Sequence, residues 1–285
     1  MSVEVASTER GADRGKEVLA GAAEAEHRRR HRERVHLWVG TTGLGVAILL
    51  FWQFGIHYLV NSRYVSDPVS IGGRIGELLA EGEVVEHLTV TLTEAGFGFL
   101  IGAGLGLLSA FALARTRRGY EVFEPFLIGF YSIPKIALAT LFILWFGLGY
   151  TPKIIMAALL VYFIVFVNAV TGIREVSPGL LQACRVFGAS RRDLLLKIVL
   201  PCAAPAVVAS IRITFTRAIE GAVLSEFVAS TQGLGYLVAR ASRAFDIETV
   251  FAGILIIAAV VMTANGLLRM VETRFMPWQT TRVHG

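Results

Sequence analysis

Five polar side chains interrupt long apolar stretches of this 285-residue sequence. They are Lys135, Asn168, Arg212, Arg217 and Glu220. A charged group in a lipid environment is costly and usually faces protein or a water-filled cavity, so these residues are candidates for contact with a solute that crosses a membrane. Guanidinium groups can bind a sulfonate, carboxylate or nitrate through two parallel hydrogen bonds. One functional interpretation is therefore that an arginine of this set meets an anionic solute.

Four of these residues also have a structural interpretation. Lys135 follows Pro134, so its ammonium group could bind carbonyls that a proline kink leaves free. Arg217 and Glu220 are three residues apart and could neutralise each other on one helix face. Asn168 could bond to a neighbouring helix or line a solute path. The sequence leaves these alternatives open.

The apolar stretches predict an all-α polytopic membrane protein. Hydrophobic residues make up 54% of the chain, and its mean hydropathy is +0.62. Runs of about 18 or more residues with few charges are typical of membrane-spanning helices. The sequence predicts six spans, at residues 37–60, 88–114, 122–147, 153–173, 202–224 and 250–270.

The distribution of Lys and Arg predicts the orientation of these spans. With the N-terminus inside, the inner segments hold 19 of the 27 basic residues. The outer segments hold five: Arg63, Arg74, Lys153, Arg240 and Arg243. Because cytoplasmic loops carry an excess of Lys and Arg, we expect both termini and the segment 174–200 to be cytoplasmic.

Residues 37–275 are predicted to form one transmembrane domain with a tail on each side. Residues 1–36 are polar and end in a basic cluster, and we expect them to be disordered. A basic tail could bind nucleic acid, but a cluster directly before a span more often sets orientation. Residues 276–285 are expected to form a short cytoplasmic tail.

Sequence patterns for bond-making chemistry are absent. The chain has no G-x-x-x-x-G-K-[ST] phosphate loop, no G-x-S-x-G elbow and no Cys/His cluster with metal-ligand spacing. Its two cysteines, Cys184 and Cys202, fall on the predicted inner side, where thiols stay reduced. We therefore expect no catalytic residue, metal or cofactor in this chain. If ATP drives it, another subunit hydrolyses the nucleotide.

Residues 177–201 carry the signals of two short helices joined by a turn. Ser177 can cap free backbone N–H groups and Pro178 suits the first helical position. Gly188 can take the left-handed conformation that ends a helix. A Ser-x-x-Asp capping box at 190–193 then predicts the start of a second helix.

The first of these helices is predicted over residues 178–187. It places Leu180, Cys184 and Phe187 on one side. Its length of about 15 Å is about half of what a bilayer core requires. The apolar stripe must therefore pack against something outside the membrane.

The second predicted span contains two overlapping G-x-x-x-G units, at residues 98–102 and 102–106. Glycines let the backbones of membrane helices approach closely, so this face should pack on another helix. The pattern does not separate packing within the chain from dimerisation.

The segment 177–201 resembles the EAA loop of bacterial ABC importer permeases, in which EAA, three residues, Gly, nine residues and I-x-L-P follow one another. Gln182 stands where the family usually has Glu, and Cys184 where it usually has Ala, so the spacing matches better than the residue identity. In that family the loop docks into a cleft on a cytoplasmic ATPase. The resemblance implies the ATPase-coupling residues Gln182, Ala183, Cys184, Phe187, Gly188, Ile198, Leu200 and Pro201.

Two further segments narrow the resemblance. Residues 132–147 contain Pro-Lys-Ile-Ala-Leu and then Leu-Phe-Ile-Leu-Trp-Phe-Gly, which is similar to the third membrane segment of permeases for nitrate, sulfonate and taurine. Residues 232–236 resemble the outer Gly-Leu-Gly segment of the same family. Its members commonly have an arginine at the position of Arg212 and a glutamate at that of Glu226.

The resemblance implies a type I (MetI-like) importer permease with six helices, two copies of which enclose a central path. The implied partners are ATP-binding-cassette ATPase subunits that bind ATP and Mg, an extracytoplasmic solute-binding protein, a second permease copy and the lipid of a bacterial inner membrane, with no nucleic acid. The implied solute is small and anionic, such as a sulfonate, nitrate or taurine. Arg217 and Glu220 replace the apolar residues usual at their positions.

Two other classes of protein fit the sequence less well. An ion-coupled secondary transporter predicts inverted repeats and several carboxylates at mid-depth, and the sequence indicates neither. A structural membrane scaffold would explain the helices and the glycine faces. It gives no reason for a capped short helix with the EAA spacing.

Overall fold

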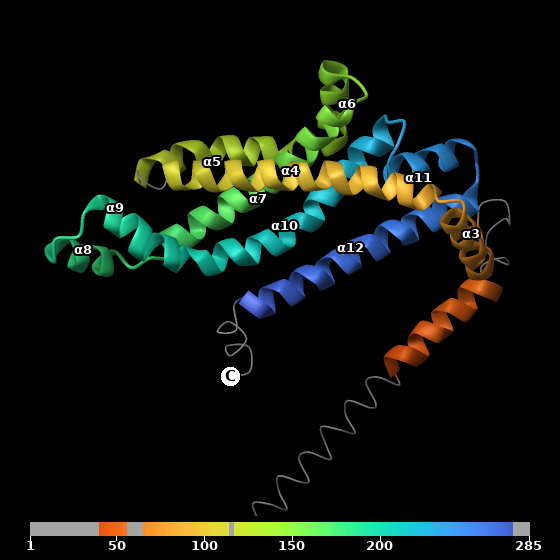
Figure 1. Ribbon diagram of the computed structural model, residues 1–285, viewed down its shortest axis with the longest axis horizontal. Coiled ribbons are helices and arrows are strands. Elements are labelled where there is room, and N and C mark those ends of the chain that lie inside the picture. Colours follow the sequence, from red (N-terminus) through yellow and green to blue (C-terminus); the bar gives the residue numbers. More distant parts are fainter. Residues whose placement is uncertain (1–39, 56–64, 114–116, 276–285) are drawn as a thin grey trace, which may run out of the picture. The chain divides into compact units, whose positions relative to one another are not determined.

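The computed structural model describes residues 40–55, 65–113 and 117–275 (Figure 1). Every regular element in these ranges is a helix, which confirms the predicted all-α class. The predicted tails, 1–36 and 276–285, lie outside the described residues.

The chain divides into two units, Met1–Val69 and Ser70–Gly285. The described part of the first unit holds an apolar helix at Gly40–Gly55, which ends in a π-helical turn at Phe51–Gly55. Within this unit, the indole N–H of Trp52 donates to the carbonyl oxygen of Ser66 at 3.0 Å.

The helices that follow account for most of the second unit. In chain order they are α3 (Pro68–Ala80), α4 (Glu83–Leu113), α5 (Arg117–Ser132), α6 (Lys135–Phe146), α7 (Tyr150–Arg174), α8 (Pro178–Val186), α9 (Arg191–Asp193), the π-helical η2 (Leu194–Val199), α10 (Leu200–Val228), α11 (Leu234–Arg243) and α12 (Ile247–Phe275).

Four of the predicted spans correspond to single helices that are long and apolar enough to cross a membrane. These are Glu83–Leu113, Tyr150–Arg174, Leu194–Val228 and Ile247–Met270. The helix at Gly40–Gly55 is shorter than a span within its described residues, because the rest of the predicted span 37–60 is not described. The structure thus supports a polytopic fold and does not by itself establish six spans.

The predicted third span is broken rather than kinked. Its two halves, Val122–Ser132 and Lys135–Phe146, meet at 88°. Pro134 has an extended ψ of 121°, and the residue before a proline is disfavoured in the helical region. Residues 133 and 134 therefore both leave the helical conformation. The resulting bend is sharper than the kink expected from the loss of one hydrogen bond at Pro134.

The core of the second unit lies between α4, α7 and α10, which run side by side in Figure 1. Small and β-branched residues dominate it, so the helix axes can approach closely. The fully buried cluster comprises Ala95, Ala103, Ala157, Val161, Val165, Ala218, Ile219 and Ala222.

The glycines of the second span pack within the chain, against α7. A Cβ atom on Gly98 would lie 2.4 Å from the Cβ of Ala157, and one on Gly102 would lie 2.3 Å from the carbonyl oxygen of Ala158. Gly104, on another face of α4, has nothing within 4 Å. Packing of the G-x-x-x-G face within the chain, one of the two predicted alternatives, is therefore confirmed.

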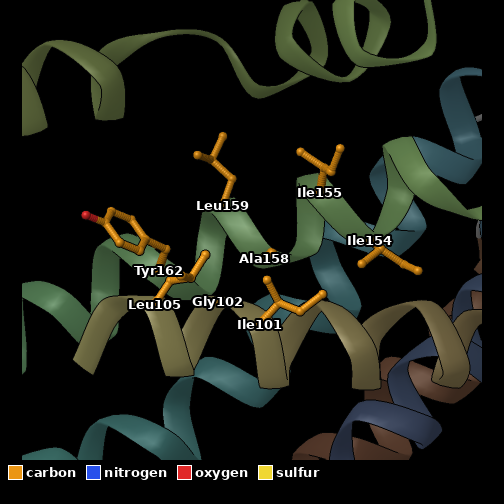
Figure 2. Close-up of a pocket in the computed structure, with 8 residues that line it drawn as sticks. All are labelled: Ile101, Gly102, Leu105, Ile154, Ile155, Ala158, Leu159 and Tyr162. Atoms are coloured by element: carbon orange, nitrogen blue, oxygen red, sulfur yellow. The ribbon is translucent and has the colours of Figure 1, made fainter. Parts of the chain in front are cut away.

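A hydrophobic cavity of about 240 Å³ lies between α4 and α7 (Figure 2). Side chains of both helices line it, among them Ile101 and Leu105 of α4 and Ile155 and Leu159 of α7. No charged group lines it, so it could not orient an ionic solute.

We expect Gly102→Val to destabilise the protein and Gly104→Val, in the same helix, to do so much less. The two changes have the same effect on helix propensity, but only the first drives a side chain into the backbone of α7. Overpacking of this kind costs about 1–3 kcal/mol. Thermal unfolding of both purified variants in one detergent measures the difference, and equal melting temperatures would contradict the close approach of α4 and α7.

Candidate functional site

The segment 177–201 begins with α8, which starts at Pro178 as predicted and ends at Val186, one residue early. Ser177 is the N-cap residue, but its side chain makes no capping hydrogen bond. The predicted role of its hydroxyl was therefore wrong, and proline at the first position contributes the start signal instead.

The C-terminus of α8 is closed by a Schellman motif. Gly188 has a φ of +86°, the left-handed conformation expected of it. The N–H of Ala189 donates to the carbonyl of Cys184 at 3.0 Å, and that of Gly188 donates to Arg185 at 3.0 Å. Because backbone bonds fix this turn, the direction in which α8 projects is set locally.

The apolar residues of α8 are left uncovered by the described part of the chain. No residue of this helix is buried. Val186 is 86% exposed and Phe187 is 89% exposed, and Leu180 is also exposed. Of the predicted coupling residues, Gln182, Ala183 and Gly188 are exposed as well and Cys184 is half-buried. Apolar side chains gathered on such a surface indicate a contact with another molecule.

The predicted capping box is confirmed. The N–H of Asp193 donates to the hydroxyl of Ser190 at 3.2 Å, and the N–H of Ser190 donates to the carboxylate of Asp193 at 3.3 Å. The ammonium of Lys197, 2.6 Å from the carboxylate, and the Ser190 hydroxyl lower the pKa of Asp193 to about 2. The cap is therefore formed with an ionised carboxylate at neutral pH.

The second short helix is not a separate element, which corrects the prediction. It continues as α9, η2 and α10 without interruption from residue 191 to residue 228. The π-helical η2 precedes Pro201, and the N–H of Leu200 donates to Leu195. Such a turn absorbs the disturbance that a proline causes in a helix. The helix therefore passes through Ile198, Leu200 and Pro201 instead of ending before them.

The side chain of Lys135 has a local structural role in this conformation. Its Nζ atom donates to the carbonyl oxygen of Tyr131 at 2.9 Å and lies 4.4 Å above the centre of the Tyr131 ring. The break at Pro134 removes this carbonyl from the regular helical ladder. The contact is the one expected if Lys135 stabilises the kink.

Asn168 bonds within its own helix. The amide nitrogen of Asn168 donates to the carbonyl of Ile164, one turn back on α7, at 2.8 Å. Arg212 lies on α10, and its side chain is outside the part of the chain that the structure describes.

Arg217 and Glu220 form the predicted ion pair. The Nη1 atom of Arg217 donates to Oε2 of Glu220 at 2.6 Å. Arg217 also lines a cavity of about 660 Å³ between α10 and α12. Neither Lys135 nor Asn168 lines that cavity, so the structure does not unite the candidate path residues in one site.

Sequence analysis missed a buried polar cluster where α4, α7, α10 and α11 meet. The carboxylate of Glu94 lies 3.3 Å from the ammonium of Lys153, and both side chains are buried. Lys153 was interpreted only as a topology signal in an outer segment; the structure buries it in the first turn of α7. Glu226, which is fully buried, belongs to the same cluster.

Glu226 ties the segment after α10 to the bundle. Its carboxylate accepts a hydrogen bond from the hydroxyl of Thr91 on α4 and another from the N–H of Gly235, each at 2.7 Å. The N–H of Gly233 donates to Nδ1 of His87 at 3.2 Å. A Cβ atom on Gly235 would lie 2.3 Å from the carbonyl oxygen of Val223. The Gly-Leu-Gly segment is thus fixed by close approach and by buried hydrogen bonds.

We expect Lys153→Met to destabilise the protein by about 3–5 kcal/mol, because it leaves the buried carboxylate of Glu94 without its counter-charge. Adding Glu94→Gln should recover much of the loss, since the second change removes the charge that Lys153→Met leaves unpaired. Thermal unfolding of wild type, the two single variants and the double variant gives the coupling energy. Additive effects of the two changes would contradict the ion pair.

Comparison with known proteins shows the family of this chain. Residues 102–277 match the family described as binding-protein-dependent transport system inner membrane component. SsuC of Bacillus subtilis, a permease protein named for aliphatic sulfonates transport, is 32% identical over 91% of this chain and 94% of its own length. The riboflavin transport system permease RibX of Chloroflexus aurantiacus is 31% identical over 82% of this chain and 88% of its own. The taurine transport system permease TauC of Escherichia coli is 28% identical over 86% and 90%.

Solved structures share the fold. A bacterial ABC transporter that imports alginate matches with a TM-score of 0.59 and 15% identity, over 87% of this chain and 99% of the other. The MetNI methionine ABC transporter in an inward-facing conformation matches with a TM-score of 0.55 and 21% identity, over 68% and 94%. The chain belongs to the inner-membrane components of binding-protein-dependent transport systems, and is a permease subunit of an ABC importer with the MetI-type fold rather than an enzyme.

Proposed function

We propose that this permease passes a small anion, such as a sulfonate, nitrate or taurine, across the bacterial inner membrane and is driven by a separate ATPase that binds α8. The observation that carries the proposal is the uninterrupted helix from residue 191 to residue 228. It joins the segment with the EAA spacing to the residues that line the α10–α12 cavity. A helix of this length spans about 55 Å, so it can carry a displacement from one end of the bundle to the other.

The contact with the ATPase is supported by the surface of α8. Its exposed apolar residues, Leu180, Val186 and Phe187, offer an unpartnered patch on a helix whose end is fixed by the Gly188 turn. An apolar anchor on a rigid element is typical of a protein interface. Gln182, Ala183, Cys184, Ile198, Leu200 and Pro201 complete the proposed coupling set.

The proposed orientation places α8 and both termini in the cytoplasm, where ATP is. The excess of basic residues in the inner segments supports this orientation. The opposite end of α10, where α11 lies in Figure 1, would then face an extracytoplasmic solute-binding protein.

The proposed assembly contains two permease copies around a central path and two ATPase subunits, which hold ATP and Mg. Closure of the ATPases on ATP would draw the two α8 helices together and change the side on which the path is open. Binding at one site would thus bias a two-state bundle at the other. This chain would form and break no covalent bond.

An anionic solute is supported by the guanidinium groups beside α10 and α12. Arg217 and Arg269 both line the cavity there, and guanidinium groups recognise planar or tripodal oxyanions well. Lys135 and Asn168 remain proposed path residues only in a conformation other than this one, because their side chains are bound locally here. Arg212 remains a proposal from its position on α10.

We expect Phe187→Asp to uncouple ATP hydrolysis from uptake, because a charge would replace an apolar side chain at the proposed ATPase contact. Phe187→Leu is the matched control, because it keeps an apolar side chain at the same position, where Phe187 is 89% exposed. Uptake and ATPase activity are measured together in proteoliposomes that contain the whole assembly.

The Phe187→Asp variant should still assemble at the membrane but lose most of the solute uptake, whereas the Phe187→Leu variant should keep uptake coupled to ATP hydrolysis. Undiminished uptake by the Phe187→Asp variant would rule out α8 as the coupling element.

A further inference from the structure

Two adjoining cavities lie between α10 and α12. The first, the arginine cavity, measures about 660 Å³ and is lined by Ile213, Thr216, Arg217, Asn265 and Arg269. The second, the apolar cavity, measures about 430 Å³ and is lined by Thr216, Ile219, Glu220, Val223, Leu224, Phe227, Ile257 and Val261. Thr216 lines both, so the two cavities meet at its side chain.

The arginine cavity presents hydrogen-bond donors. The hydroxyl of Thr216 donates to Oδ1 of Asn265 at 2.8 Å, which occupies the acceptor end of the amide and leaves its two N–H donors for another molecule. Arg217 uses one nitrogen for Glu220, and a guanidinium group has five N–H donors. The lining contains no carboxylate.

The arginine cavity also carries an unbalanced positive charge. Glu220 neutralises Arg217 at 2.6 Å, but no carboxylate in the described part of the chain forms an ion pair with Arg269. Arg269 lies at the proposed inner end of the apolar span Ile247–Met270, one residue before the span ends. A cation at such a position is stabilised by an anion or by access to water. The cavity therefore fits an oxyanion better than a neutral or cationic group.

The apolar cavity has walls that suit a hydrocarbon. Ile219, Val223 and Phe227 of α10 face Ile257 and Val261 of α12 across it. Its one charged residue, Glu220, is already bound to Arg217. An alkyl or aryl group could leave water here and gain about 25 cal/mol for each Å² of apolar surface that it buries.

We propose that the two cavities together form one binding site for an organic anion with an apolar body. The oxyanion contacts Arg269, the amide of Asn265 and the remaining donors of Arg217, and the apolar body passes Thr216 into the apolar cavity. This inference rests on the proposed function and narrows its solute class: an alkanesulfonate or a comparable carboxylate fits both cavities, whereas nitrate fills only the first.

Saturation-transfer NMR on the full-length chain in phosphatidylcholine nanodiscs tests the site. Hexanesulfonate is the probe, with methanesulfonate and nitrate as competitors. Hexanesulfonate should bind more tightly than either competitor. Arg269→Gln should raise its Kd by about tenfold, the loss expected for one charged hydrogen-bonding partner. Arg243→Gln, an equal loss of charge on an exposed residue of α11, should leave the Kd unchanged.

A second variant tests the apolar cavity. Ile257→Phe should weaken the binding of hexanesulfonate and leave that of methanesulfonate unchanged, because it fills the apolar cavity and spares the arginine cavity. Equal loss in the Arg269 and Arg243 variants, or tighter binding of nitrate than of hexanesulfonate, would overturn the inference.

The experiment also separates a solute from a lipid headgroup, whose phosphate has similar chemistry. Nanodiscs that contain phosphatidylglycerol should still give the hexanesulfonate signal; loss of the signal there would assign the arginine cavity to lipid and overturn the inference. If the whole assembly couples ATP hydrolysis to uptake but this chain binds no sulfonate, the binding site is wrong and the proposed function stands. Binding without coupling would overturn the proposed function and leave the site intact.

Discussion

The structure depends on the continuity of one helix, from residue 191 to residue 228. A proline inside a helix removes a hydrogen bond and clashes with the preceding turn, so a chain with Pro201 and Pro205 in this region could have broken there, as it does at Pro134. Here the helix instead continues through a π-helical turn at Leu194–Val199, in which the N–H of Leu200 donates to Leu195, one residue further back than in an α-helix. The same helix therefore extends from the turn after α8 to the buried carboxylate of Glu226.

The two ends of this helix are held by different interactions. At one end, the Gly188 turn and the capping box at Ser190 and Asp193 fix its start through local backbone and side-chain bonds. At the other end, Glu226 binds Thr91 and the N–H of Gly235 in a buried cluster that also contains Lys153. Unpaired buried charges would be costly, so the second end resists rearrangement. The cavities between α10 and α12 lie between these two fixed points.

How much of this could be predicted from the sequence depends on how local each feature is. The capping box and the Gly188 turn involve residues within a few positions, and the sequence predicts both. The Arg217–Glu220 pair is equally local, and the sequence offers it as one of two interpretations. The pairing of Glu94 with Lys153 joins α4 to α7 and has no local signal, so the lysine was interpreted only as part of the charge distribution. The continuity of the helix was missed because Pro201 and Pro205 favour a helix start, and only the π-helical turn shows how the first is accommodated. The contribution of Arg269 and Asn265 to one cavity with Arg217 likewise requires the packing of α12 on α10.

The central claim is that motion at α8 is transmitted along this helix. Pulsed electron-electron double resonance measures this transmission most directly in the reconstituted assembly. One pair of spin labels is placed at Val186 on the two copies of the permease. A second pair is placed at Phe227, near the far end of α10. The native Cys184 and Cys202 would first be replaced. We expect a non-hydrolysable ATP analogue to shorten the Val186 distance and to change the Phe227 distance over the same concentration range. A Val186 distance that does not respond to nucleotide, or a Phe227 distance that stays fixed while the Val186 distance changes, would contradict the account.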